Sequence, residues 1–381
     1  MKVLSLGMDN NIFKPGSRGR DYAVEYGSLV DELHIVAYTL KKHGVAKKMQ
    51  QISRNVFVYP TNLKWRIMYP FVTFWFCLEL IKKRGMDQTN SLITSQEGMT
   101  NVPATWLSRL TKIPLQVQIH TDFLSPHYSI GLFRTWLQKL GYSIGIKRAK
   151  CIRVVSNRIK RSLVERYNTD PNKIIVLPIR AEIEIYKSAK MKMDLHRRFP
   201  QFSFIILMVS RLEREKDYPL ALKVLKKMAK RYPKIGMIIV GKGSQKEKIQ
   251  NLVSKLNLDT NVVLEDWQDQ DALASYYHSA DIYLLTSKYE GYGLSLIEAA
   301  VSGCPIITTD VGLAGDVLTS ESAVIVPVGD EKALLVAIDR LIKVPDLRRM
   351  LADRAKQEVA KLPSKVEYLA QYKKIWDSSC N

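Results

Sequence analysis

The stretch SKYEGYGLSLIEA, residues 287–299, decides how the second half of this chain folds. The residues just before it, 281–286, form an apolar run typical of a buried strand. After it, Leu294, Ile297 and Val301 recur at the spacing of an α-helix. The glycines between strand and helix predict a tight turn, where free backbone N–H groups attract anions and a ligand can approach the backbone closely. We therefore predict a phosphate or sugar site at this turn.

Two carboxylates of the same stretch, Glu290 and Glu298, stand eight residues apart. Glu290 falls in the turn, whereas Glu298 lies more than one helical turn further along the helix. We expect them to touch different parts of one extended ligand. The alternative is that Glu290 is only an acid near a helix N-terminus and Glu298 a solvated surface residue.

Length and composition indicate a folded protein with two domains. A chain of 381 residues exceeds one ordinary core, and 46% apolar with 25% charged residues is typical of globular proteins. The four cysteines are scattered singly, which argues for a reducing compartment and against a disulfide frame or a thiolate metal site. The cysteine spacing therefore implies no metal. Residues 1–6 predict a short strand rather than a signal peptide, so we expect a cytoplasmic protein.

The positive charge is concentrated in the first half. The net charge is +21, and residues 1–180 hold 28 Lys and Arg against 11 Asp and Glu. A field of this size attracts polyanions, which include nucleic acid, anionic lipid headgroups and phosphorylated substrates.

Strand and helix patterns alternate along both halves, which predicts doubly wound parallel sheets. We expect strands over 2–6, 33–40, 56–59, 91–95, 115–120, 151–155 and 174–177, and then over 202–209, 235–240, 262–265, 281–286, 305–308 and 323–326. The segment 178–200 has mixed charge and little apolar periodicity, so it predicts a link. The fold class is therefore α/β with two Rossmann-like domains, 1–180 and 200–360, that face one another across a cleft.

Two segments of the basic half interleave aromatic and cationic residues. They supply six candidates for contact with a membrane interface: Trp65, Phe71, Trp75, Phe76, Phe133 and Trp136. The apolar run of the first segment is too short to span a bilayer and is interrupted by Pro70. The first segment can equally be a helix buried against the sheet.

Candidate ligand residues of the second domain follow successive strands. A doubly wound sheet binds ligands beyond the carboxyl ends of its strands. Those ends carry two cations, a glycine turn, a tryptophan and the acidic turn, which also contains glycines: Arg211, Lys216, Gly241, Gly243, Trp267 and 290–293. This combination predicts a nucleoside diphosphate sugar as the ligand.

Three segments, SRLEREK at 210–216, VGKG at 240–243 and EGYGLSLIEA at 290–299, resemble the signatures of family 4 retaining glycosyltransferases (glycosyl transferases group 1), which have the GT-B fold. The resemblance implies that Arg211 and Lys216 bind the donor diphosphate and that Glu298 binds the ribose. It assigns the donor sugar to Glu290, Gly291, Tyr292, Gly293 and Leu294, and places Trp267 near the base.

In the first domain, His120 matches the active-site histidine of that family, and Gly16 with Ser17 approximates its glycine loop. The resemblance also implies that the final helix, about 365–381, packs back on the first domain. The segment 269–271, DQD, is similar to the metal-binding motif of another glycosyltransferase fold, but its position before a helical pattern favours a helix cap.

The expected function is retaining, metal-independent transfer of a sugar from a UDP- or GDP-linked donor to an acceptor hydroxyl, with no cofactor. His120, Arg211, Lys216 and Glu290 are the expected catalytic residues. The basic first half favours a lipid-linked glycan acceptor in cell-surface polysaccharide synthesis, with the protein peripheral on the inner face of the cytoplasmic membrane. The alternatives are a GT-B epimerase or phosphorylase, and a basic nucleic-acid-binding protein, which no recognised nucleic-acid module supports.

Overall fold

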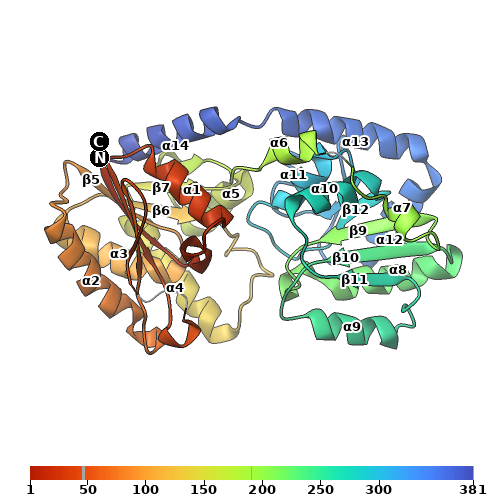
Figure 1. Ribbon diagram of the computed structural model, residues 1–381, viewed down its shortest axis with the longest axis horizontal. Coiled ribbons are helices and arrows are strands. Elements are labelled where there is room, and N and C mark those ends of the chain that lie inside the picture. Colours follow the sequence, from red (N-terminus) through yellow and green to blue (C-terminus); the bar gives the residue numbers. More distant parts are fainter. Residues whose placement is uncertain (45–47, 190, 381) are drawn as a thin grey trace. The chain divides into compact units, whose positions relative to one another are not determined.

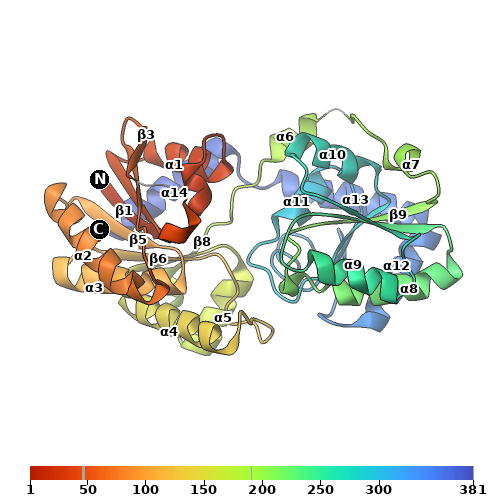
Figure 2. The ribbon, with the colours of Figure 1, turned by 60° about the horizontal axis from the view of Figure 1, so that its bottom comes forward.

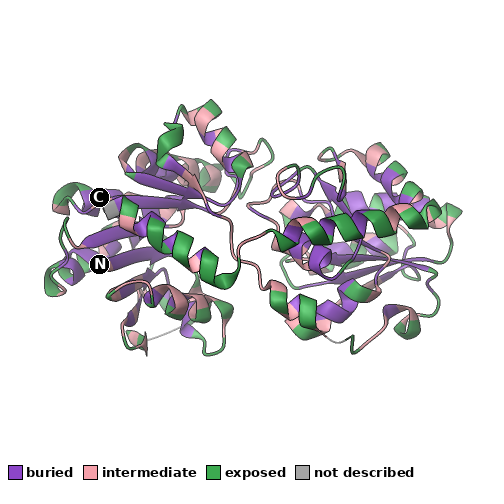
Figure 3. Ribbon diagram, turned by 90° about the horizontal axis from the view of Figure 1, so that it is seen from above, coloured by how far each residue is buried: buried purple, intermediate pink, exposed green. Residues whose placement is uncertain are grey.

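The computed structural model describes residues 1–44, 48–189 and 191–380, and the chain divides into two units. The first unit consists of Met1–Leu124, Ser129–Pro178 and Pro363–Asn381, and the second of Ser125–Tyr128 and Ile179–Leu362. Each unit is built on its own sheet with helices on both faces (Figure 1). Figure 3 shows that the strands are buried while the helices expose their outer faces.

The first unit holds an eight-stranded sheet in the order β3-β4-β2-β1-β5-β6-β7-β8. Its strands are β1 (Lys2–Gly7), β2 (Glu32–Ala37), β3 (Gln50–Ser53), β4 (Val56–Pro60), β5 (Ser91–Ser95), β6 (Leu115–Ile119), β7 (Cys151–Val154) and β8 (Ile174–Val176). All neighbours are parallel except β3, which pairs antiparallel with β4 at the edge of the sheet. The prediction of an all-parallel sheet is wrong at β3, because a short, polar edge strand has no apolar pattern to mark it.

The helices of the first unit are α1 (Arg18–Gly27), α2 (Tyr69–Lys83), α3 (Gly98–Thr111), α4 (Leu132–Arg148), α5 (Asn157–Tyr167) and α14 (Lys365–Cys380). Right-handed crossovers place α1 on one face of the sheet and α2 to α5 on the other. α14 packs on the face of α1, where Tyr372 stacks on Tyr26 at 4.6 Å between ring centroids. Figure 2 shows α2, α3 and α4 in sequence on the opposite face.

A buried arginine fixes α14 to the sheet. Arg153 of β7 donates hydrogen bonds to the carbonyls of Leu177 (3.1 Å) and Pro178 (2.9 Å). The same guanidinium donates to Gln118 Oε1 (2.9 Å) and to the Tyr368 hydroxyl of α14 (3.0 Å). The arginine therefore joins the end of the first unit's sheet, strand β6 and the returning C-terminal helix. Residue 381, the last of the range predicted for that helix, lies outside the described residues.

The second unit holds a six-stranded, all-parallel sheet in the order β11-β10-β9-β12-β13-β14. Its strands are β9 (Phe204–Val209), β10 (Ile235–Val240), β11 (Val262–Glu265), β12 (Ile282–Leu285), β13 (Ile306–Thr309) and β14 (Val324–Val326). Every strand lies within one or two residues of its predicted range. This is the regularity expected of buried parallel strands, which read as continuous apolar runs.

The helices of the second unit are α6 (Ile183–Ser188), α7 (Leu195–Arg198), α8 (Tyr218–Arg231), α9 (Lys246–Lys255), α10 (Gln270–Ser279), α11 (Leu294–Val301), α12 (Glu331–Lys343) and α13 (Pro345–Ala360). The crossovers place α8 and α9 on one face of the sheet and α10 and α11 on the other. The segment predicted only as a link carries α6 and α7, which pack on α10. The two Rossmann-like parallel sheets confirm the predicted α/β fold class.

Candidate active site

Three loops at the carboxyl ends of β9, β10 and β12 interlock through backbone hydrogen bonds. The Leu212 N–H donates to Lys242 O at 2.8 Å, and the Gln245 N–H donates back to Leu212 O at 2.9 Å. The Lys288 N–H of the acidic turn donates to Glu215 O at 2.7 Å. The cationic loop after β9 is therefore held from both sides, which fixes the main chain that carries the predicted phosphate ligands.

Glycine is required where these loops touch. A Cβ on Gly243 would lie 2.3 Å from the Leu212 carbonyl oxygen, and one on Gly241 would lie 1.9 Å from the Ser210 oxygen. Gly293 caps α11 with φ +93°, a left-handed conformation that side chains resist. Both predicted glycine turns therefore serve close packing in the structure, and their contact with a donor stays a prediction.

The predicted cation and carboxylate, Lys216 and Glu290, form an ion pair. Their Nζ and Oε1 atoms are 2.5 Å apart, and their side chains are only 11% and 14% exposed. Ser287 Oγ donates to the same carboxylate oxygen at 2.7 Å, and Thr286 Oγ1 donates to Lys216 O at 2.8 Å. Lys216 is therefore a buried, paired cation rather than a solvated one. The pair brings a fixed positive charge and a fixed acceptor to one point.

Arg211 differs from Lys216, because its side chain is 71% exposed and forms an exposed ion pair with Glu215 at 3.0 Å. An exposed ion pair of this kind contributes little to stability and does not hold the guanidinium in place. We predicted two fixed cations, and only Lys216 is fixed. Arg211 can leave Glu215 for an anionic ligand at small cost.

Glu298 of α11 accepts a hydrogen bond from the hydroxyl of Tyr277 at 3.1 Å. Tyr277 is a fully buried residue of α10. Burial, together with the charge of Glu298, raises the pKa of its phenol well above the usual range. The phenol therefore stays protonated and keeps donating to the carboxylate. Sequence patterns missed Tyr277, because it belongs to no glycine turn or charged motif. Ser287 begins the stretch 287–299, but the pattern did not predict its hydrogen bond to Glu290.

Gly291, Tyr292 and Leu294 lie between Glu290 and the body of α11. Tyr292 is buried, and its carbonyl accepts from the Leu313 N–H at 2.9 Å, so the turn is anchored from below. No acidic residue and no side-chain cap occupy the first turn of α11. An anion placed there would meet backbone N–H groups and the positive end of the helix dipole.

Trp267 follows β11 and is 55% exposed, so its ring is available at the same end of the sheet. Two residues on, Asp269 accepts from the Ala272 N–H at 2.8 Å and caps α10. The prediction of a helix cap in this segment is confirmed.

His120 follows β6 at the carboxyl end of the first unit's sheet. Its Nε2 is buried and has no hydrogen-bond partner among the described residues. Burial, with the charge of Arg153, lowers the pKa of the imidazole to about 3, so the ring is neutral at physiological pH. Beside β6, β5 ends at Ser95, and two residues further on burial raises the pKa of Glu97, the N-cap of α3, to about 7. Glu97 carries no motif, and sequence patterns did not indicate it.

The predicted glycine loop begins helix α1. Gly16 has φ +71°, and Ser17 accepts from the Arg20 N–H at 3.3 Å as the N-cap. Ser17 also donates to Asn11 O at 2.5 Å. The Ser17 hydroxyl is therefore hydrogen-bonded within the turn, and its contact with the nucleotide-sugar donor stays a prediction.

The six aromatic candidates of the first unit are exposed. The exposed fractions are 61% for Trp65, 61% for Phe71, 66% for Trp75, 37% for Phe76, 70% for Phe133 and 57% for Trp136. α2 buries its other side, which includes Tyr69 and Cys77. α2 is therefore buried on one side, as the alternative requires, and exposes aromatic side chains on the other. Among the described residues, no helix combines the length and the apolar character needed to cross a membrane.

Comparisons with known proteins agree with this geometry. Residues 196–358 match the family model of glycosyl transferases group 1. The chain is 32% identical over 126 residues to a 2-deoxystreptamine N-acetyl-D-glucosaminyltransferase of Niallia circulans, a match that covers 33% of this chain and 32% of that protein. The chain thus spans about a third of the length of that curated relative.

Two solved structures cover nearly the whole chain. Sucrose-phosphate synthase from Thermosynechococcus elongatus has a TM-score of 0.80 and 18% identity, over 99% of both chains. HepE of Anabaena, in complex with UDP and glucose, has a TM-score of 0.75 and 17% identity, over 99% of this chain and 100% of that chain. The fold is therefore GT-B. The family match and the fold together support a glycosyltransferase of the GT-B type.

Proposed function

We propose that this protein transfers a glycosyl group from a nucleoside diphosphate sugar to an acceptor hydroxyl, with retention of anomeric configuration and without a metal. The observation that carries the proposal is the buried Lys216–Glu290 pair at 2.5 Å, held on interlocked loops next to the uncapped start of α11. A fixed cation, helix N–H groups and a carboxylate match the diphosphate and the hydroxyls of such a donor. The glycosyl transferases group 1 match of residues 196–358 supports the same donor.

Each residue has a distinct role in the proposed reaction. Lys216 and Arg211 hold the diphosphate, and Glu298, oriented by Tyr277, accepts hydrogen bonds from the ribose hydroxyls. Glu290 keeps one oxygen on Lys216 and Ser287 and uses its remaining acceptor capacity for a sugar hydroxyl. The neutral His120 offers its Nε2 to the donor sugar or the acceptor.

In the proposed step, the bond between the anomeric carbon and the phosphate oxygen breaks. The acceptor oxygen then bonds to that carbon from the same face, and its proton passes to the departing phosphate. Charge develops on that phosphate, where Lys216 and the start of α11 stabilise it. Fixed donors that act on developing charge are usually the largest single contribution to such a rate.

A screen of nucleoside diphosphates by thermal shift tests the donor. We expect UDP or GDP to raise the apparent melting temperature, since a ligand that binds only the folded protein stabilises it. Arg211→Ala and Glu298→Ala should each remove most of that shift, whereas Lys223→Ala, an exposed residue on the outer side of α8, should keep it. The UDP in the HepE structure favours the uridine nucleotide. No shift with any nucleotide would contradict the proposed donor class.

We further propose that the acceptor is a lipid-linked glycan used for cell-surface polysaccharide and that the protein works on the inner face of the cytoplasmic membrane. The support is the set of exposed aromatic side chains on α2, on α4 and at Trp65 just before α2, which alternates with cations such as Lys64, Arg66 and Arg134. Exposed apolar side chains flanked by cations suit an interface of acyl chains and anionic headgroups. α3 contacts both α2 and α4, so both segments belong to one layer of helices.

Flotation with liposomes tests this surface. Vesicles with anionic lipid should retain the protein at low salt, and raised salt should weaken retention because headgroup attraction is screened. The double variant Phe133→Ser, Trp136→Ser should lose most retention. Val336→Ser removes an equally exposed apolar side chain (63%) from α12 and should retain the wild-type behaviour. Wild-type protein that stays unbound at low salt would contradict the proposed surface.

A further inference from the structure

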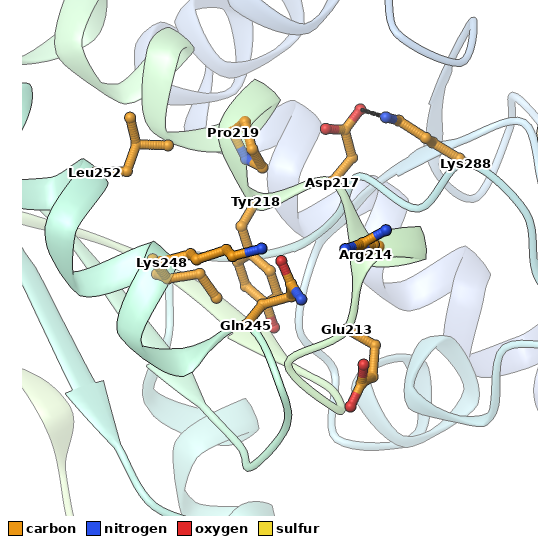
Figure 4. A pocket seen from close by; sticks show the side chains of 10 residues that line it. Glu213, Arg214, Asp217, Tyr218, Pro219, Gln245, Lys248, Leu252 and Lys288 are labelled. Carbon is orange, nitrogen blue, oxygen red and sulfur yellow. Dashed lines mark ion pairs between the residues drawn. The ribbon is translucent and has the colours of Figure 1, made fainter. Parts of the chain in front are cut away.

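A cavity lies beside the cationic loop after β9, between the start of α8 and helix α9. Its volume is about 290 Å³, and Figure 4 shows its lining from the loop, both helices and the acidic turn. None of Arg211, Lys216, Glu290 and Glu298 lines it. The cavity is therefore separate from the residues assigned to the donor.

The lining is basic on one side. Three cations border the cavity, Arg214 from the loop, Lys248 from α9 and Lys288 from the acidic turn. Lys288 pairs with Asp217 at 3.6 Å. Within the described residues, the Arg214 guanidinium and the Lys248 ammonium make no hydrogen bond or ion pair, so both cations are available to a ligand in the cavity. Such charges suit a compact anion.

The remaining lining is not suited to a bare anion. Glu213, Asp217 and Gln245 add acceptors and an amide, and Pro219 with Leu252 adds apolar surface. Glu213 already accepts from Ser244 N and Oγ at 3.0 and 2.7 Å. Carboxylates repel a second anion but accept hydrogen bonds from hydroxyl groups, and apolar surface packs on the C–H face of a sugar ring.

We infer that this cavity binds a sugar phosphate. Its phosphate lies between Arg214 and Lys248, its hydroxyls meet Asp217 and Gln245, and its ring lies on Pro219 and Leu252. The volume is at the lower end of small-molecule sites, which fits one hexose phosphate and excludes a whole nucleoside diphosphate sugar. This site goes beyond the proposed transfer reaction and does not depend on it.

The position of the cavity couples it to the donor residues. Arg214 and Asp217 flank Lys216 in sequence, and the Lys288 N–H donates to Glu215 O at 2.7 Å. A bound sugar phosphate therefore contacts the same loop that carries Lys216. Because binding at two coupled sites is reciprocal, occupancy changes the affinity for nucleotide, and nucleotide changes the affinity for sugar phosphate by the same factor.

Titration calorimetry with glucose 6-phosphate and glucose 1-phosphate tests the inference, with free glucose and inorganic phosphate as separate arms. We expect at least one of the two hexose phosphates to bind. Free glucose and inorganic phosphate should each bind at least tenfold more weakly than that hexose phosphate. Arg214→Ala and Lys248→Ala should each weaken binding about tenfold or more, as expected for a lost charge-assisted hydrogen bond. The matched control is Lys255→Ala, an exposed lysine of α9 that does not line the cavity, and it should bind as wild type does.

A repeat with the nucleotide sites saturated by UDP separates this inference from the proposed donor site. Binding of the hexose phosphate should persist in that repeat and in Glu298→Ala. If UDP displaces it completely, or if Arg214→Ala and Lys248→Ala leave it unchanged, the ligand lies elsewhere and the inference is wrong. Absence of binding by both hexose phosphates, or equally tight binding of inorganic phosphate alone, would also overturn it.

Discussion

Replacing Lys216 with alanine is expected to lower donor turnover by about a hundredfold to a thousandfold, the effect of removing one preorganised donor from a developing negative charge. The ammonium is held by Glu290 at 2.5 Å and is 11% exposed, so water cannot readily replace it. The affinity for UDP should fall by a smaller factor, because the phosphate charge grows as the bond to the sugar breaks. The measurement is the rate of nucleoside diphosphate release from the donor that the nucleotide screen identifies.

A matched series separates the charge of Lys216 from its packing. Lys216→Met keeps most of the side-chain volume and should lose activity like alanine does, whereas Lys216→Arg should retain part of it. Glu290→Gln keeps an acceptor for Ser287 but weakens the pair. Lys223→Ala on the exposed side of α8 should be unaffected. Wild-type turnover in Lys216→Met would refute the role of this cation.

Replacing Arg153 with methionine is expected to lower the free energy of unfolding of the first unit by about 3 to 5 kcal/mol. The guanidinium donates to Leu177 O, Pro178 O, Gln118 Oε1 and the Tyr368 hydroxyl, and the residue is 3% exposed. Methionine fills much of the space but removes the guanidinium's hydrogen bonds to these buried acceptors, of which Gln118 Oε1 keeps the one from the Tyr372 hydroxyl at 3.1 Å. Urea unfolding followed by circular dichroism measures the loss, and hydrogen exchange of α14 locates it.

Two further variants make this prediction specific. Tyr368→Phe removes one hydrogen bond of the network and should cost about 1 kcal/mol. Arg231→Met breaks the ion pair between Arg231 and Asp339. Because the Arg231 side chain is 57% exposed, this substitution should lower the free energy of unfolding by less than about 1 kcal/mol. A loss in Arg153→Met no larger than in Arg231→Met would show that the buried network does not hold α14.

Arg153 also bears on the candidate active site, because Gln118, one of its acceptors, stands two residues before His120 on the same strand end. Its charge helps to keep the imidazole neutral. The two largest expected effects thus come from a lysine that sequence patterns identified and an arginine that they did not.

The sequence by itself determined the fold class and most of the strands. Buried parallel strands are continuous apolar runs separated by helical patterns, so residues such as 235–240 and 262–265 were found within their actual bounds. The acidic turn and the cationic loop were also found, because glycine and paired charges at strand ends have few other uses. The polar edge strand β3 had no such signal.

Only the tertiary structure decided which of those residues act together. Lys216 and Glu290 are 74 residues apart in the chain, and their pairing depends on the order in which β9 and β12 lie in the sheet. The same is true of Tyr277 with Glu298, of the Arg153 network with α14, and of the cavity between α8 and α9. Local patterns report the burial and propensity of one segment, whereas a contact between distant segments depends on how the segments pack, which no single segment encodes.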